Sequence, residues 1–487
     1  MDCILLTHAH IDHSGLIPLM YVNGFRGQVY STSATAQLCE IMLRDSAHIQ
    51  MFEAEWRNRK AARSGGKLKE FVPLYDMDAA VNVCKQFVGC EYDRVYDIAE
   101  GIKIRFTDVG HLLGSASIEV WATEKTENGD VTEKIVFSGD IGNINKPIIK
   151  DPKHVRDADY VVMESTYGNR SHGGTPNYVE DLTDIFKRTF ERGGNVVIPS
   201  FAVGRTQELL YIIRKIKEDN LVGRDFDVYM DSPLAIEATN IFIKNVESCF
   251  DDEAVELVRK GINPLSFPGL KYATTGDESK QINFDPNPKV IISSSGMCEA
   301  GRIRHHLKHN LWRPECTIVF VGYQAVGTTG RIIVDGAEEI KLFGEPIQIK
   351  AEIVQLKGSS GHADKDGLLC WINAFDTKPK KVFVVHGEDS VCDEFTECLK
   401  EEYGYDAMAP YTGGSYDLIA DRVISEGVKE RKTRRTTSTQ RGKTVFDRLV
   451  AAGKRLMTVI THNEGGTNKD LAKFTDQINA LCDKWDR

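Results

Sequence analysis

Residues 8–13 read His-Ala-His-Ile-Asp-His, and their side chains could bind metal ions. Imidazole and carboxylate groups are ligands that zinc commonly takes from proteins. The segment lies between an apolar run and a Ser-Gly pair, which favours a tight loop between a strand and a helix over a helix face. In an extended segment His8 and His10 point the same way, so Asp12 and His13 can reach a second ion close by. The spacing therefore predicts two adjacent zinc ions.

Five further runs of strand-forming residues each lead to a polar residue that could bind a metal or act in catalysis. The runs are residues 102–107, 134–137, 160–163, 351–356 and 381–385, and the polar residues that follow them are His111, Asp140, Glu164, His362 and His386. Because loops at the ends of strands converge on one edge of an open α/β sheet, we expect all five side chains at that edge. A single histidine after a strand is more often structural than a ligand. The repetition of the pattern, together with the hexapeptide, favours a metal site.

Composition restricts the class of protein. A chain of 487 residues predicts two or three domains, and no run approaches the ~20 apolar residues of a membrane span. The start of the chain has no signal-peptide pattern, so we expect a cytoplasmic protein without membrane contact. The eleven cysteines form no Cys-x-x-Cys pair, which argues against a disulfide framework and a thiolate zinc site. The net charge of -10 excludes a uniformly basic surface, so nucleic-acid binding would need local basic patches and the metals.

The order of the motifs resembles the β-CASP branch of the metallo-β-lactamase superfamily. The motifs are His-x-His-x-Asp-His, Gly-His, Ser-Gly-Asp, Glu-Ser-Thr-Tyr-Gly, Ser-Gly-His-Ala-Asp and Val-His-Gly-Glu, and they run from residue 3 to about residue 415. The branch contains the endonuclease subunit of the pre-mRNA 3′ cleavage complex and ribonuclease J. The resemblance implies an α/β fold, a metallo-β-lactamase αββα sandwich with an inserted parallel α/β β-CASP domain, and RNA as the substrate.

The resemblance also implies roles for the candidate residues. His8, His10 and His111 would hold one Zn²⁺, and Asp12, His13 and His386 the other, with Asp140 bridging the two. Ions ~3.5–4 Å apart can share one water, lower its pKa toward neutrality and supply a hydroxide for in-line attack on phosphorus. His362 would contact the scissile phosphate and protonate the departing 3′ oxygen, and Glu164 would orient its ring. The catalytic residues would thus be His362, Glu164 and Asp12.

The chain divides into four predicted segments. Residues 1–170 form the first part of the metallo-β-lactamase domain, 171–350 the β-CASP insertion, 351–425 the return segment, and 426–487 a basic linker with C-terminal helices. In the insertion, predicted strands at 195–198, 226–229, 289–292 and 317–320 alternate with helical stretches such as 206–217. Such alternation predicts a parallel sheet covered by helices.

Gly and Ser gather in three loops of the insertion, at residues 200–205, 293–296 and 322–331. Backbone amides at such turns, followed by helix N-termini, can bind phosphates. We therefore expect substrate contacts from Arg205, Ser295, Arg302 and Arg331. The alternative is ordinary turn chemistry between strand and helix.

The C-terminal part contains a basic segment and an amphipathic pattern. Residues 429–443 are rich in Lys and Arg, and we favour a flexible linker over an RNA-tracking segment. A Thr467-x-x-Asp470 capping pattern precedes apolar residues at steps of three and four, which predicts a helix. These residues are Leu471, Phe474, Ile478, Leu481 and Trp485. We expect this stripe to pack on its own domain, with a homodimer seam as the alternative.

The position of the hexapeptide differs from that in the family. Members of the branch carry roughly fifty or more residues before it, which supply the first strands of the sheet, so those strands would be missing here and one sheet edge would be unpaired. The loop with His8 and His10 would then lie near a fraying terminus and bind metal poorly. We therefore expect a misplaced start codon or truncated gene model over a working short enzyme. A catalytically weak scaffold, owing to the missing strands, is an alternative.

The sequence predicts a zinc-dependent ribonuclease that hydrolyses RNA phosphodiester bonds with a two-metal-activated hydroxide, endonucleolytically or with 5′-exonuclease action. One alternative is a metallohydrolase of small esters or thioesters on the same core, which has no use for a phosphate-contacting His362 or a large inserted cap. Another is a non-catalytic scaffold, and the seven occupied ligand positions count against it.

Overall fold

The computed structural model describes residues 1–63, 70–127, 129–171, 173, 177–356 and 360–429. In the C-terminal part it describes residues 452–453, 456–457, 459–461, 463 and 468–485. The chain forms two compact units, residues 1–427 and 428–487. Among the described residues, no helix combines the length and apolarity needed to cross a bilayer.

The chain begins with a three-stranded parallel sheet in the order β1-β2-β3. Its strands are β1 (Cys3–Leu5), β2 (Gln28–Thr32) and β3 (Phe87–Cys90), and the helices between them are α1 (Ile11–Ser14), α2 (Ile17–Val22), α3 (Ser33–Arg63) and α4 (Met77–Cys84). Side chains of α3 and α4 pack on Val29 at one face of this sheet. In the described residues β1 lies at the sheet edge. The expectation that further strands belong beside it stays a prediction.

A mixed seven-stranded sheet lies against the first sheet, in the order β18-β17-β8-β7-β6-β5-β4. The strands are β4 (Val95–Ala99), β5 (Ile102–Asp108), β6 (Ala116–Thr126), β7 (Gly129–Phe137), β8 (Tyr160–Glu164), β17 (Lys381–Val385) and β18 (Ala407–Met408). Ile104 and Phe106 pack toward Leu5 and Tyr30 of the smaller sheet. On the other face, α13 (Lys365–Ile372) and α14 (Asp389–Glu401) cover the sheet, and Trp371 is fully enclosed there. The two sheets are thus stacked between two layers of helices.

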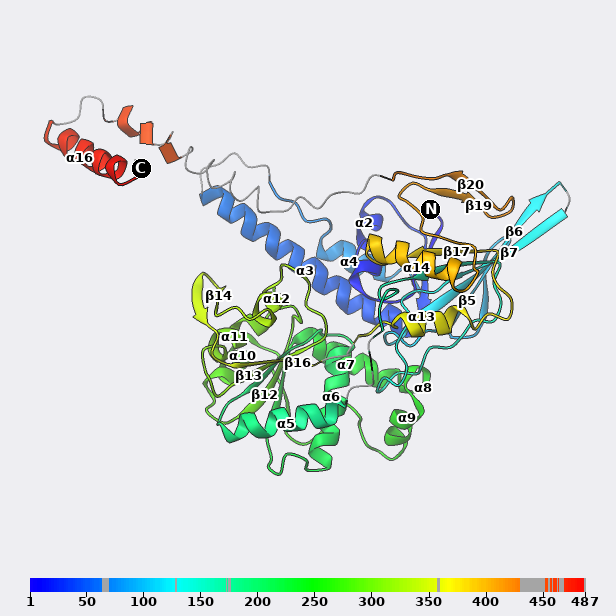
Figure 1. Cartoon of the computed structure of the whole chain (residues 1–487), viewed down its shortest axis with the longest axis horizontal. Coiled ribbons are helices and arrows are strands. Elements are labelled where there is room, and N and C mark those ends of the chain that lie inside the picture. The colour runs from blue at the N-terminus through cyan, green and yellow to red at the C-terminus, as the bar shows by residue number, and fades with distance from the viewer. Residues whose placement is uncertain are drawn as a thin grey trace. The chain divides into compact units, whose positions relative to one another are not determined.

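The third sheet is parallel and has six strands, in the order β11-β10-β12-β9-β13-β16. They are β9 (Val196–Pro199), β10 (Asp227–Asp231), β11 (Leu270–Tyr272), β12 (Lys289–Ser293), β13 (Thr317–Val321) and β16 (Glu352–Leu356). The predicted strands of the insertion are confirmed as β9, β10, β12 and β13. Strands β9, β12 and β13 are rich in β-branched residues and buried on both faces, whereas β10 has one such residue and is partly buried. Figure 1 shows this sheet, in green to yellow, with helices on both sides.

Eight helices of the described residues accompany the third sheet. They are α5 (Tyr178–Glu191), α6 (Arg205–Glu218), α7 (Pro233–Lys244), α8 (Val246–Cys249), α9 (Asp252–Arg259), α10 (Gly276–Phe284), α11 (Ile303–Asn310) and α12 (Thr329–Val334). Helices α5, α6 and α7 pack on one face, where Ile198 and Val319 point, and α10, α11 and α12 pack on the face of Val197 and Ile318. The predicted helix at 206–217 is confirmed as α6.

Strand β16 corrects one expectation. The run 351–356 was expected at the same sheet edge as the strands before His111, Asp140 and His386. It pairs with β13 of the six-stranded sheet instead, with Thr317 opposite Glu352. Strand β16 joins that sheet because the edge of β13 is open to a further strand, and β16 pairs with this edge in parallel register. The chain returns to the seven-stranded sheet only after β16, at His362, which forms an isolated bridge with Gly142.

Two hairpins and one long helix complete the described structure. The hairpins are β14 (Glu339–Leu342) with β15 (Glu345–Gln348), and β19 (Ser415–Asp417) with β20 (Arg422–Ser425). The predicted C-terminal helix is confirmed as α16 (Asn468–Trp485), where Leu471, Phe474 and Ile478 are half-buried and Leu481 is 55% exposed. Residues 430–443 of the predicted basic linker, and Thr467 of the capping pattern, lie outside the described residues.

Candidate metal centre

The hexapeptide turns from an extended segment into a helix. His8 follows β1 and is fully buried, and His10 is the N-cap residue of α1. Asp12 and His13 lie on α1 itself, so the prediction that all four ligands lie in a loop is wrong for these two. Because the backbone turns into α1 after His10, the side chains of Asp12 and His13 point in a different direction from those of His8 and His10. The two pairs can therefore belong to two separate ligand groups.

Glycines shape the backbone just before two other ligand candidates. Gly110 and Gly139 have φ of +65° and +61°, a region that favours glycine. A Cβ would lie 2.7 Å from the Lys150 carbonyl oxygen at Gly110, and 2.9 Å from the Ala116 carbonyl oxygen at Gly139. The turns that aim His111 and Asp140 therefore depend on the glycine that precedes each of them.

Four side chains meet in a first ligand group, which consists of His8, His10, His111 and Asp140. The Nε2 atoms of His8 and His111 each lie 3.1 Å from His10 Nδ1. They lie 3.3 and 3.5 Å from Asp140 Oδ2. A zinc ion ~2.0–2.1 Å from four tetrahedral donors keeps those donors about 3.3 Å apart. The measured separations fit a zinc ion at the centre of the group.

A second ligand group consists of Asp12, His13 and His386. The Nε2 atoms of His13 and His386 lie 3.3 and 3.2 Å from Asp140 Oδ1, and Asp12 Oδ2 lies 3.8 Å from His13 Nε2. His386 has a left-handed backbone with φ of 50°, and its carbonyl oxygen accepts a hydrogen bond from the Ser165 backbone N–H. The Asp12 side chain is 65% exposed, so this group opens toward solvent.

Asp140 stands between the two groups. Its Oδ2 faces the first group and its Oδ1 faces the second. Asp140 Oδ1 and His13 Nε2 are buried, and neither has a hydrogen-bond partner of suitable geometry among the described residues. Buried polar atoms without partners are rare because they are costly. A divalent cation would satisfy both atoms, so these donors fit a metal site.

The electrostatics of the buried group suit cation binding. Burial lowers the pKa of His8, and it lowers the pKa of His10 and His111 well below the usual value. These imidazoles are therefore neutral, with lone pairs free to bind a cation. Burial opposes ionisation of Asp140, but the close imidazoles of His13, His386 and His8 outweigh it and lower the pKa of that carboxyl. The same contact with Asp140 raises the pKa of His386 to about 9.

His362 and Glu164 form a hydrogen-bonded pair beside the ligand groups. His362 Nδ1 lies 3.0 Å from Glu164 Oε2, and its Nε2 lies 3.8 Å from Asp140 Oδ2. Glu164 is held in turn by the Ile141 backbone N–H and the Thr166 hydroxyl, which both donate to it. Burial acts to lower the pKa of His362, but the Glu164 carboxylate outweighs burial and raises it. The geometry leaves the Nε2 edge of His362 facing the ligand groups.

Several partners of these residues have no signal in the sequence. Thr7 Oγ1 lies 3.1 Å from His8 Nδ1, and the Gly361 carbonyl oxygen lies 3.1 Å from His111 Nδ1. Such contacts fix the orientation of metal-binding imidazoles. Thr7 adjoins the hexapeptide and could have been suspected from its position. Gly361 is 250 residues from His111 in the sequence, so only the fold brings them together.

Lys146 connects the metal centre to the six-stranded sheet. Its Nζ donates to the His111 carbonyl oxygen at 3.1 Å and lies 3.2 Å from Glu208 of α6. Glu208 also pairs with Arg205. Burial acts to raise the pKa of Glu208, but the charges of Arg205 and Lys146 outweigh it and lower that pKa. This charged cluster lies where the carboxyl ends of the six-stranded sheet meet the metal centre.

The four predicted substrate contacts lie in different settings. Arg205 lines a cavity of about 1080 Å³, together with Lys146, Ile144 and Ser360. The Arg302 guanidinium donates to Asp231 Oδ1 at 2.6 Å and to the carbonyl oxygens of Ala273 and Thr274, which is a structural use of its donors.

The other two predicted contacts are more exposed. Arg331 pairs with Asp335 one helical turn away, on the surface of α12. Ser295 is partly exposed, and its hydroxyl lies 3.4 Å from the backbone of Ala300. Substrate contact by all four residues stays a prediction.

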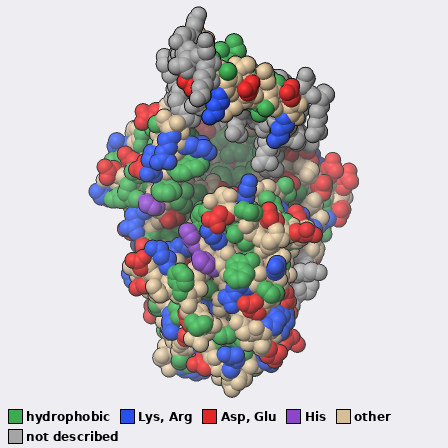
Figure 2. All heavy atoms as spheres, turned by 90° about the vertical axis from the view of Figure 1, so that its left-hand side faces the viewer, with side chains coloured by type: hydrophobic (Ala, Val, Ile, Leu, Met, Phe, Trp, Pro, Cys, Tyr) green, Lys and Arg blue, Asp and Glu red, His purple; other side chains and the backbone are tan. Residues whose placement is uncertain are grey.

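Charges of both signs cover the surface. On the face shown in Figure 2, Lys and Arg side chains lie among Asp and Glu side chains. This distribution agrees with the net charge of -10. Attraction of a polyanion would therefore depend on local groups.

Comparison with known proteins finds two family models in the second half of the chain. Residues 206–333 match the Beta-Casp domain, and residues 346–410 match the Zn-dependent metallo-hydrolase RNA specificity domain. The second match includes His362 and His386 of the metal centre.

Known relatives cover most of the chain. Ribonuclease TTHA0252 of Thermus thermophilus is 34% identical over 389 residues, which is 80% of this chain and 82% of the relative. The RNase J-like protein of Methanocaldococcus jannaschii is 31% identical over 392 residues, with the same shares. The transcription termination factor FttA of Methanosarcina mazei is 32% identical over 419 residues, and the match spans 84% of this chain but only 62% of FttA. The chain therefore belongs to the β-CASP family of metal-dependent ribonucleases of the metallo-β-lactamase type.

Proposed function

We propose that this chain is a two-zinc ribonuclease that cleaves RNA at internal phosphodiester bonds, with 5′-exonuclease action as a second mode. The observation that carries the proposal is the position of Asp140, whose two carboxylate oxygens face two separate ligand groups. One carboxylate can bridge two ions, whereas one imidazole nitrogen cannot. The first group would hold one Zn²⁺ and the second group the other.

Bound zinc would supply positive charge and lower the pKa of a water molecule, which favours attack on phosphorus. The residues of the chain would prepare the rest of the reaction. His362 is suited to general acid catalysis because the Glu164 carboxylate favours its protonated form. With Nδ1–H donated to Glu164, the Nε2–H of His362 can contact a phosphate oxygen and pass its proton to the departing 3′ oxygen. Asp12, at the open side, would complete the second group.

The proposal also covers the fold, the domain segments, the location and the oligomeric state. The two stacked sheets between helices correspond to an αββα sandwich, with the six-stranded sheet as its insertion. We place the domain segments at residues 1–170, 171–350, 351–425 and 426–487, with β16 belonging to the inserted sheet. A cytoplasmic location and a homodimer remain predictions.

The first experiment tests metal binding and activity together. We expect about two zinc ions per wild-type chain by elemental analysis, and loss of both metal and ribonuclease activity in Asp140→Ala. RNA labelled at either end should give products of intermediate length, which identify internal cleavage. Active protein without a bound transition metal would overturn the assignment of the site.

A second variant separates the role of His362 from metal binding. His362→Ala should keep most of its zinc and lose about 10²–10⁴-fold in cleavage rate, as is typical for removal of a general acid. His309→Ala, an exposed histidine on α11, is the matched control and should cleave RNA at the wild-type rate. Loss of zinc in His362→Ala would show that this residue is a ligand.

A further inference from the structure

Two exposed aromatic rings lie at the carboxyl edge of the six-stranded sheet. Phe201 follows β9 and is 47% exposed, and Tyr323 follows β13 and is 49% exposed. Strands β9 and β13 are parallel neighbours, with Thr317 opposite Val196, so both loops leave from the same edge. Large apolar side chains are usually more buried than these two. Two exposed rings at the same sheet edge therefore indicate a candidate binding surface.

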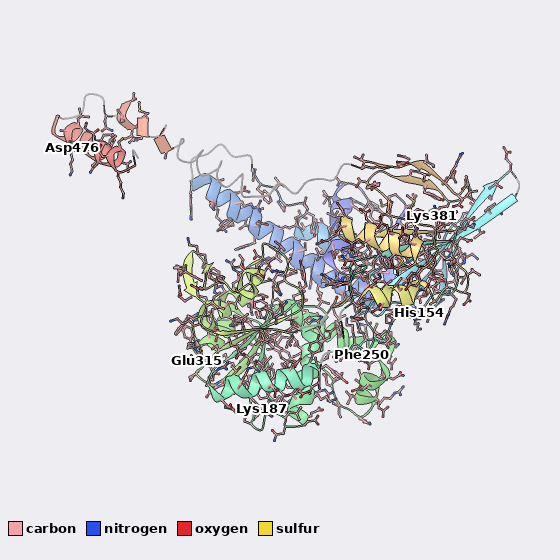
Figure 3. The ribbon with its side chains drawn as sticks, in the orientation of Figure 1. His154, Lys187, Phe250, Glu315, Lys381 and Asp476 are labelled. Atoms are coloured by element: carbon pink, nitrogen blue, oxygen red, sulfur yellow. The ribbon has the colours of Figure 1, made fainter. Side chains whose placement is uncertain are left out.

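This edge is the one that meets the metal centre. A Cβ at Gly204, three residues after Phe201, would lie 3.1 Å from the side chain of Leu112, the neighbour of His111. Three residues span at most ~11 Å. In Figure 3, Glu315 at the amino end of β13 lies on the side of the six-stranded sheet turned away from Lys381 of β17, so the carboxyl ends point toward the other sheets.

The Phe201 ring and the side chain next to Tyr323 in the sequence both contact Gly296. A Cβ at Gly296 would lie 3.1 Å from the Phe201 ring, so the ring packs directly on this glycine. The Phe201 carbonyl oxygen accepts a hydrogen bond of 2.7 Å from the Thr206 hydroxyl. Gln324, beside Tyr323, is buried and donates from Nε2 to the Gly296 carbonyl oxygen at 3.1 Å. The loops that carry Phe201 and Tyr323 therefore meet at Gly296.

We propose that Phe201 and Tyr323 form a stacking platform for one or two nucleobases of the single-stranded RNA, next to the scissile phosphate. The inference rests on the proposed ribonuclease function. Aromatic rings with one open face bind any base, because every base has a π-face. The metal centre and the nearby cations favour phosphates, so the platform would supply contacts to the bases. A ring that is held in advance, as that of Phe201 is by Gly296, loses little freedom on binding.

The test uses the zinc-loaded full chain and a short single-stranded RNA. Phe201→Ala and Tyr323→Ala should each raise KM by about 5- to 150-fold, the range of one lost stacking contact, and change kcat little. Phe201→Trp should restore KM. Phe284→Ala is the matched control, because Phe284 is 70% exposed but lies at the end of α10, before β12, at the opposite edge. Its KM should equal that of the wild type.

A base-free nucleotide identifies the contact itself. Replacing successive nucleotides by abasic ones should raise KM of the wild type at one or two positions. At those positions Phe201→Ala or Tyr323→Ala should show no further rise, because ring and base form one contact. Unchanged KM in both alanine variants, or penalties that add in full, would overturn the platform.

A binding measurement keeps the platform testable apart from catalysis. In a phosphorothioate RNA with 2-aminopurine at those positions, wild-type protein should quench the fluorescence and Phe201→Ala should not. If the wild type cleaves no RNA, the proposed function fails, while quenching still decides the platform. Equal quenching by wild type and both alanine variants would refute the platform even in an active enzyme.

Discussion

Asp108 is a buried carboxyl near the metal centre that sequence reasoning did not single out. Its side chain is 5% exposed, and its Oδ1 accepts a hydrogen bond of 3.0 Å from the Gly110 backbone N–H. That bond supports the turn before His111. Burial raises the pKa of Asp108 to about 7, although the Gly110 N–H acts in the opposite direction. The residue therefore changes charge in the folded protein within the physiological pH range.

This shift predicts a pH-dependent stability. The pKa of an unfolded aspartate is ~3.9, so between pH ~4 and pH 7 the folded protein holds a proton that the unfolded chain has lost. The free energy of unfolding should therefore fall as pH rises through this window and then stay level. Asp108→Asn keeps the acceptor for Gly110 and removes the ionisation. In zinc-free protein its melting temperature relative to wild type should rise from pH 5 to pH 8.

The exposed Asp97 provides the control for this prediction. Its side chain is 75% exposed, so Asp97→Asn should shift the melting temperature equally at both pH values. A difference between Asp108→Asn and wild type that does not change with pH would contradict the raised pKa.

At the scale of residues, the sequence predicted which side chains gather and missed what holds them. Four possible metal ligands lie within six positions, and this density alone indicates a ligand group. They are His8, His10, Asp12 and His13. Asp108 carries no such signal, because a carboxylate at the end of a strand is common and its burial depends on packing. Whether such a carboxylate is buried depends on the tertiary structure.

At the scale of elements, Lys146 connects the metal-centre loop to α6. The Lys146 and Glu208 side chains are only 11% and 10% exposed. Removing one partner of a buried ion pair leaves the other charge poorly compensated. Here Arg205 would still face Glu208, which limits the loss.

Lys146→Met should therefore lower the free energy of unfolding by about 1–3 kcal/mol, the cost of an unsatisfied buried group. Denaturant unfolding measures it. Lys125→Met is the matched control, since Lys125 pairs with Glu100 while 77% exposed, and it should change stability by less than ~1 kcal/mol. Equal stability of Lys146→Met and wild type would show that α6 is held by apolar packing alone.

The strands were predictable because runs of β-branched residues have few other uses, and β12 and β13 match their predicted runs to within one residue. The sequence did not indicate which sheet each strand joins. Strands β16 and β17 are both short and contain β-branched residues, and the β13 partner of β16 became known only from the register. The short helix α1 also escaped prediction, because four residues show no periodicity.

At the scale of the whole molecule, the chain separates into the unit of residues 1–427, which contains the metal centre, and the unit of residues 428–487. The basic segment 429–443 belongs to the first part of the second unit. Deleting residues 428–487 should leave zinc content unchanged. If the segment contacts phosphates, RNA affinity should fall and the slope of log affinity against log salt should decrease by ~0.7 per lost contact. Equal slopes for both forms would identify the segment as a linker.

The family and the division into a catalytic core with an insertion could be predicted from the sequence, since motifs keep their order along the chain. The stacking of two sheets depends on packing between distant segments such as Tyr30 and Phe106, which no local pattern encodes.

The distribution of ligands along the chain has a consequence for biosynthesis. The first ligand group is complete once Asp140 has been made, whereas His362 and His386 come from the segment that follows the whole insertion. By the proposed function, a ribosome-bound nascent chain would hold the first cation early but would lack His362 and the complete second group until synthesis has passed residue 386. We expect the emerging polypeptide to be inert toward the messenger that encodes it, because the proposed site is complete only after residue 386 of the 487 has been made.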